Sequence, residues 1–168
     1  MMTRRDTIQV TAAAGLAGGS AEAARDTKKE YLAVYHGLIA DWGRKDIDAV
    51  LARMTDDIVW HYLVGLPPLT GKAAARGFLE KFGAPIKEVR WRIFDAAVVE
   101  DRLMVEGVDE YLTTTGGHVV VPYMGILTFR GGLVSRWRDY CDSGLAGKMK
   151  NGEAAPDYVN TLIDRKAI

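Results

Sequence analysis

Two aspartates, Asp109 and Asp139, are the first candidates for chemistry, because each interrupts a run of alternating apolar residues. Each has an aromatic residue two positions away, Tyr111 in one run and Trp137 in the other. Apolar surroundings raise the pKa of a carboxyl group, and two neighbouring carboxyl groups push their titrations apart. Such a pair can supply one protonated acid and one ionised base. The alternative is that either aspartate faces water on the polar side of its strand.

The spacing of two Gly-Gly connections predicts that these aspartates are neighbours. Three-residue loops would pair Asp109 with Tyr123 and Tyr123 with Asp139, whereas two-residue loops would place Met124 between the aspartates. With either loop type, the two carboxyl groups share one face and one cross-strand row. The candidate substrate-binding residues on that face are Tyr111, Tyr123 or Met124, Trp137 and Cys141, and Tyr62 and Leu63 of an earlier strand are candidates for the same role.

Helical spacing dominates the first half of the chain and two-residue alternation dominates the second half. Consecutive strands after helices indicate an α+β domain, with helices covering one face of a curled antiparallel sheet. We expect helices over 27–43, 46–54 and 70–82, a strand over 58–63, a strand beginning at Val89, strands over 103–114, 118–129 and 133–141, and a final helix over 156–168.

Composition restricts the class of protein. The 168 residues include 22 basic and 22 acidic side chains, so no net charge favours nucleic acid. No apolar run reaches the ~20 residues of a membrane span, so we expect no membrane insertion. One cysteine and three dispersed histidines lack the spacing of metal ligands, and we expect no metal and no cofactor.

The N-terminal stretch has the order of features of an export signal. Arg4-Arg5 precedes a weakly apolar run, and Ala21-Glu22-Ala23 fits the small-x-small rule for cleavage. Residues 1–23 resemble a twin-arginine signal, which predicts a periplasmic or secreted domain over 24–168. An uncleaved N-terminus and a cytoplasmic protein are the alternative.

The order of elements resembles the nuclear-transport-factor-2-like or SnoaL-like fold, a cone-shaped curved sheet covered by three N-terminal helices. Three segments resemble the limonene-1,2-epoxide hydrolase family: Leu66–Gly71, Val105–Asp109 and Trp137–Asp142. The resemblance implies that Asp139 activates a water, which attacks an epoxide carbon, while Asp109 protonates the epoxide oxygen. It implies a small hydrophobic substrate, a vicinal diol product and no covalent enzyme intermediate.

The sequence departs from this family at three positions. Gly107 stands where the family carries an arginine between its two acids. His61 and Leu63 stand where the family holds the water with tyrosine and asparagine, and His61 is therefore a candidate catalytic residue. Arg92 is a candidate for charge support, because a two-residue turn at 100–101 would place it beside Asp109.

Two other functions use the same pocket. An isomerase or cyclase of the SnoaL or ketosteroid-isomerase kind would move a proton beside a carbonyl, with Tyr62, Tyr111, Tyr123 or His61 as the hydrogen-bond donor. A non-catalytic protein would bind a hydrophobic ligand there. On the other face of the strands, a semi-apolar exterior predicts a homodimer. Its residues are Met104, Glu106, Val108, Glu110 and Leu112.

Overall fold

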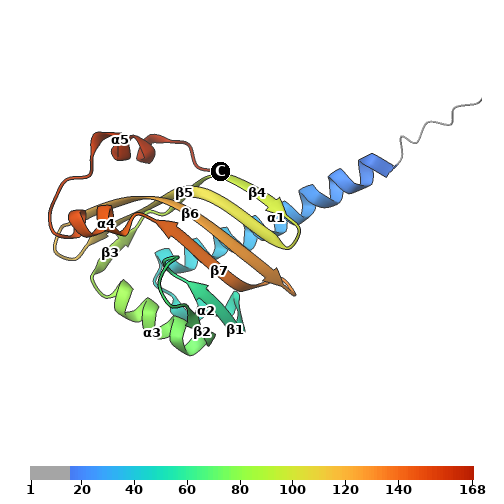
Figure 1. The fold of residues 1–168 in the computed structure, drawn as a ribbon, viewed down its shortest axis with the longest axis horizontal. Helices are drawn as coiled ribbons and strands as arrows, with labels where there is room; N and C mark the ends of the chain where they lie inside the picture. Colours follow the sequence, from blue (N-terminus) through green and yellow to red (C-terminus); the bar gives the residue numbers. More distant parts are fainter. Residues whose placement is uncertain (1–15) are drawn as a thin grey trace, which may run out of the picture.

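Seven strands form one curled sheet in the computed structural model, which describes residues 16–168 (Figure 1). The parallel pairing of β1 with β7 makes the sheet mixed, which corrects the prediction of a purely antiparallel one. The α+β architecture of the prediction is confirmed. The order is β2 (Leu69–Thr70), β1 (Met54–His61), β7 (Leu133–Cys141), β6 (His118–Arg130), β5 (Arg102–Thr113) and β3 (Ile86–Val89), and β4 (Arg92–Val99) also pairs with β5.

Three helices precede or interrupt the first strands: α1 (Leu16–Gly43), α2 (Ile47–Ala52) and α3 (Gly71–Gly83). Tyr35, Leu38 and Trp42 recur at helical spacing on α1 and are buried against the sheet. Asp46 caps α2 by accepting a hydrogen bond of 3.0 Å from the Ala49 amide. The three helices predicted before residue 83 are present, although α1 begins upstream of residue 27.

The predicted cross-strand row is wrong, although both aspartates do lie on the same face. Asp109 pairs with Val121, and Asp139 pairs with Gly125. Gly125 in turn pairs with Val105, four residues before Asp109 on β5. Because the offset is an even number of residues, both carboxyl groups still point to the inner side of the sheet.

The turns explain the different register. The first connection closes between Thr113 and Gly117, where the Thr113 amide donates to the Gly117 carbonyl at 2.8 Å, and Gly116 takes the left-handed conformation at φ 88°. The second connection turns at Gly131-Gly132, both with positive φ. An irregularity between Thr128 and Phe129 then adds one residue to the count.

The chain after β7 differs most from the prediction. The helix α4 (Ser143–Lys150) was not predicted, and the single helix over 156–168 is replaced by α5 (Asp157–Asn160) and the short 3₁₀ helix η1 (Thr161–Asp164). Arg92 donates a hydrogen bond of 2.6 Å to the Ile163 carbonyl and pairs with Glu110, which is 2% exposed. The C-terminal segment therefore lies against the outer side of β5.

This covering changes the predicted dimer surface. Val108 and Glu110 are buried within one chain and are unavailable to a partner. Met124 and Tyr140 pair across β6 and β7 on the outer face and remain 41% and 40% exposed. A homodimer stays a prediction, and Met124 and Tyr140 belong to the part of the outer face that remains accessible to a partner.

None of the described helices is long and apolar enough to cross a membrane. Most of the predicted export signal lies outside the described residues, so export also stays a prediction.

Candidate functional site

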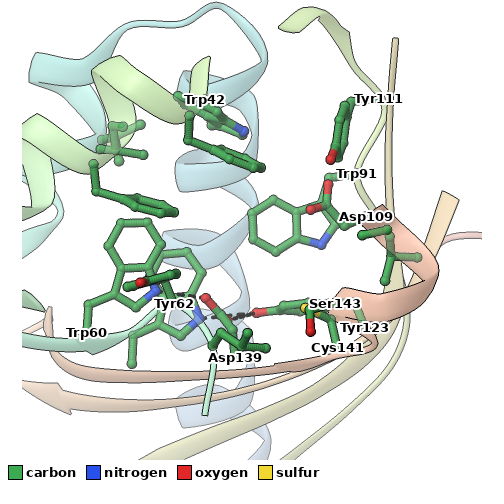
Figure 2. A pocket seen from close by; sticks show the side chains of 18 of the residues that line it. Trp42, Trp60, Tyr62, Trp91, Asp109, Tyr111, Tyr123, Asp139, Cys141 and Ser143 are labelled. Atoms are coloured by element: carbon green, nitrogen blue, oxygen red, sulfur yellow. Dashed lines mark hydrogen bonds between the residues drawn. The ribbon is translucent and has the colours of Figure 1, made fainter. Parts of the chain in front are cut away.

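The inner face of the sheet and the helices α1, α2, α3 and α4 enclose a cavity of about 290 Å³ (Figure 2). Its walls are mainly aromatic and aliphatic, and this volume is at the small end for small-molecule sites. Both candidate aspartates line it, Asp109 from β5 and Asp139 from β7. The geometric prediction of two carboxyl groups in an apolar cup is therefore confirmed, by a different register from the one expected.

Two donors from different elements hold the Asp139 carboxyl group. The Trp60 indole Nε1 donates to its Oδ2 at 2.7 Å, and the Tyr123 hydroxyl donates to its Oδ1 at 2.6 Å (Figure 2). Trp60 also stacks on Trp137, with ring centroids 4.8 Å apart. Asp139 is thus fixed in orientation while it still faces the cavity, and each oxygen keeps a second lone pair for another donor.

The direction of the Tyr123 hydrogen bond follows from its other partners. The Trp137 indole Nε1 and the Tyr35 hydroxyl each lie 3.1 Å from the Tyr123 oxygen, and both donate to it. With two lone pairs occupied, the Tyr123 hydrogen must go to Asp139. The chain Tyr35 to Tyr123 to Asp139 therefore ends on the carboxyl group, and this direction favours its ionised form.

Asp109 has a different environment. No hydrogen bond to its carboxyl group is present among the described residues, and burial is the main influence on its pKa. Burial raises that pKa to about 6, against a smaller lowering by the Lys150 charge. Asp109 is therefore a carboxyl group close to its titration range at neutral pH and free to donate into the cavity.

Burial also raises the pKa of Asp139, to about 7, and the Asp109 charge adds to this while the hydrogen bonds of Tyr123 and Trp60 oppose it. The two acids titrate over overlapping pH ranges and share protons as a pair. Taken alone, the two values would ionise Asp109 first. The hydrogen bonds of Tyr123 and Trp60 keep the Asp139 value from rising further, and among the described residues Asp109 accepts no such bond, so the two carboxyl groups differ in donors although their values lie close together.

Eight of the eleven predicted site residues line the cavity. Cys141 is one of them, and burial raises its thiol pKa to about 11, so it is a protonated wall residue at neutral pH. The full set is Asp109, Asp139, Tyr62, Leu63, Tyr111, Tyr123, Trp137 and Cys141.

Three predicted residues lie elsewhere. His61 pairs with Arg138 at the end of β1 and is not part of the lining, because the inward positions of that strand are Ile58 and Trp60. Met124 faces outward. Arg92 pairs with Val108 across β4 and β5 and contacts Glu110 instead of Asp109, so the predicted charge support is wrong.

The residue at the position of the missing arginine is constrained by the fold. A Cβ atom at Gly107 would lie 2.1 Å from the Arg92 carbonyl oxygen. No side chain is accommodated there, and the two acids are not bridged by a cation from β5.

Sequence reasoning missed several lining residues. Trp60 could have been found by placing every second apolar residue of its strand inward. The α4 residues Ser143 and Lys150 were missed together with their helix. The remaining unpredicted aromatic residues of the lining are Trp42, Phe78, Phe82 and Trp91. No group of three or more His, Cys, Asp or Glu side chains able to hold a metal ion occurs in the part of the chain that the structure describes.

Comparison with known proteins agrees with this architecture. A family model described as a SnoaL-like domain matches residues 35–137. No curated protein matches the chain.

Solved structures with the same fold carry different descriptions. An LEH-like epoxide hydrolase from M. tuberculosis has 20% identity and a TM-score of 0.63, with 73% of this chain and 90% of that one covered. A provisionally assigned isomerase from Bacillus subtilis has 16% identity and a TM-score of 0.67, covering 77% and 99%. A provisionally assigned SnoaL-like polyketide cyclase from Shewanella denitrificans has 13% identity and a TM-score of 0.65, covering 73% and 98%. At these identities the likeness extends to the fold and not to the activity.

Proposed function

Because this chain belongs to the SnoaL-like domain family, whose members share a cupped sheet, we propose that its cavity hydrolyses a small hydrophobic epoxide to a vicinal diol. The observation that carries the proposal is the unequal hydrogen bonding of two buried carboxyl groups. Asp139, which accepts from Trp60 and Tyr123, is the base, and Asp109, which accepts no hydrogen bond from the residues that the structure describes, is the acid.

In the proposed reaction, water is the only co-reactant. Asp139 takes a proton from a water held at its free lone pair, and the water oxygen attacks an epoxide carbon. The carbon–oxygen bond of the ring breaks, and Asp109 gives its proton to the leaving oxygen. Proton return from Asp139 to Asp109 through water restores the starting state. Ring strain lowers the activation barrier for opening the epoxide, and positioned acid and base groups each contribute about 10²–10⁴ in rate.

The test is a panel of cycloalkene, terpene and styrene epoxides, assayed for diol. We expect Asp109→Asn and Asp139→Asn each to lose about 10² or more in turnover. Asp101→Asn is the matched control, since Asp101 is exposed in the β4–β5 turn and should retain full activity. Wild-type turnover in either of the first two variants would contradict the proposal.

Isotope labelling tests the direct attack. With enzyme in excess over epoxide in H₂¹⁸O, we expect one labelled oxygen in every diol formed in the first turnover. If a carboxylate formed an ester first, the oxygen delivered in that turnover would come from unlabelled protein. An unlabelled first-turnover diol would therefore rule out Asp139 as a general base.

A second function, an isomerase or cyclase, is favoured by one specific feature. Tyr111 lies two residues from Asp109 on β5, lines the cavity and has its pKa raised by burial and by the Asp109 charge. A phenol beside a carboxyl group suits proton transfer next to a carbonyl, with Tyr111 donating to the enolate oxygen. Deuterium uptake into a ketone without diol formation, abolished by Tyr111→Phe, would favour this function over epoxide hydrolysis.

A further inference from the structure

One face of α4 forms a wall of the cavity and ends in a cation. Ser143, Ala146, Gly147 and Lys150 follow the i, i+3, i+4, i+7 spacing of one helix face, and all four line the cavity. The first three side chains are small and leave room for a ligand. Lys150 is the sole long side chain of this face.

The Lys150 ammonium group is held at the cavity by aromatic rings instead of by an acid. Its Nζ lies 5.4 Å from the centroid of the Phe82 ring and 5.9 Å from that of Tyr111. Such distances give a favourable cation–π interaction. Within residues 22–168, Lys150 has no carboxylate within 4.0 Å, and it is the one lysine or arginine among the lining residues. The residue is exposed to solvent, which places the charge where the cavity opens.

We propose that Lys150 binds an anionic group of the substrate at the mouth of the cavity, so that the substrate class is a hydrophobic monoacid. This inference rests on the proposed function for the reacting end of the molecule, which lies deeper, at Asp109 and Asp139. A single ammonium without an arginine suits a carboxylate or sulfonate better than a phosphate, which favours several donors or a guanidinium fork.

The position of Lys150 relative to the two acids supports this arrangement. Its charge lowers the pKa of Asp109. An anion bound at Lys150 would offset that charge and help Asp109 to keep the proton that it must donate.

Two fluorescent probes with one common body test the inference. N-Phenyl-1-naphthylamine is neutral, and 1-anilinonaphthalene-8-sulfonate adds a sulfonate to the same rings. Both are titrated into the wild-type chain, Lys150→Met and the matched control Lys148→Met, because Lys148 is exposed on α4 but does not line the cavity. Gly147→Leu reports whether each probe occupies the cavity, since a Cβ atom at Gly147 meets no atom within 4 Å.

We expect Lys150→Met to weaken sulfonate binding about fivefold, the upper range for an exposed ion pair. Binding of the neutral probe should change less than twofold, Lys148→Met should alter neither probe, and Gly147→Leu should weaken both. Equal weakening of both probes by Lys150→Met, unchanged sulfonate binding, the same effect from Lys148→Met, or sulfonate binding that ignores Gly147→Leu would each overturn the inference.

These titrations need no turnover, so the two proposals fail separately. Epoxide hydrolysis without charge-selective probe binding would overturn the role of Lys150 alone. Charge-selective binding in a chain that hydrolyses neither the neutral epoxides of the panel nor an epoxide that carries a carboxylate would overturn the proposed reaction alone.

Discussion

Replacement of Asp109 by asparagine should stabilise the folded chain at neutral and alkaline pH. Burial raises the pKa of Asp109 from 3.8 to about 6, and no hydrogen bond from the described residues stabilises its charge. At 1.36 kcal/mol for each pH unit, the ionised carboxylate destabilises the fold by about 3 kcal/mol above pH 7. This is an upper limit, because the carboxyl group faces the cavity, where water can reach it.

The difference between the pKa of Asp109 in the folded and in the unfolded chain also fixes how stability changes with pH. Since the pKa is higher in the folded state, the folded chain holds this proton between about pH 4 and 6 while the unfolded chain has lost it. Below pH 3.8 Asp109 is protonated in both states, and the wild-type chain has its full stability with respect to this group. That stability is lost as the pH rises through 6, because the buried carboxyl group then ionises in the folded chain. The advantage of Asp109→Asn over the wild type should therefore grow from near zero at pH 4 to its maximum above pH 7.

Denaturant unfolding between pH 4 and pH 8 measures this difference directly. Each kcal/mol corresponds to about 2–4 °C in melting temperature for a domain of this size. Asp101→Asn, at the exposed turn, should follow the wild type at every pH. If Asp109→Asn is as stable as the wild type or less stable at pH 8, the carboxyl group is not desolvated, and the reasoning that burial raises the pKa of Asp109 is refuted.

Three further changes should give distinct results. Asp139→Asn should lower the free energy of unfolding by about 1–3 kcal/mol at pH 4.5, measured by denaturation, because in either orientation the amide NH₂ faces the donor of Trp60 or of Tyr123. Tyr123→Phe should move the acid limb of kcat/KM to higher pH, since its hydroxyl lowers the pKa of Asp139, and a pH–rate profile checks this. Gly107→Ala should cost about 1–3 kcal/mol or more in unfolding free energy, measured thermally, because its Cβ would meet the Arg92 carbonyl at 2.1 Å.

The last three strands and the inner face could be predicted from the sequence because they depend on local alternation, whereas β1 begins four residues before its predicted start and the strand expected from Val89 is divided into β3 and β4. The three strands that carry the site match their predicted ranges to within one residue at each end. Register could not be predicted, because it depends on where each turn starts and on an irregularity after Thr128. The two aspartates still lie on a common face because the errors in the predicted register of the β5–β6 and β6–β7 pairs add up to an even number of residues.

The helix α4 could not be predicted, because its composition is unfavourable for a helix. Asp142 is a good N-cap, and its carboxylate accepts a hydrogen bond of 2.9 Å from the Leu145 amide. Gly144 and Gly147 lie within the helix, however, and each lowers helix propensity by about 1 kcal/mol relative to alanine. Packing against β6 stabilises the helix α4, which its own helix propensity would not stabilise. The same packing brings Lys150 to the cavity.

The roles of the two acids are a non-local property. The alternation of side chains along β5 and β7 places both aspartates on the inner face of the sheet, but it predicts no difference between them. What distinguishes them is the set of donors around Asp139, which come from α1, β1, β6 and β7 through Tyr35, Trp60, Tyr123 and Trp137. None of these four residues is close in sequence to Asp109, which has no such donors within the described part of the chain. An exchange of roles would require moving a hydrogen-bond network built on four elements, so the asymmetry that assigns base and acid is a consequence of the tertiary fold.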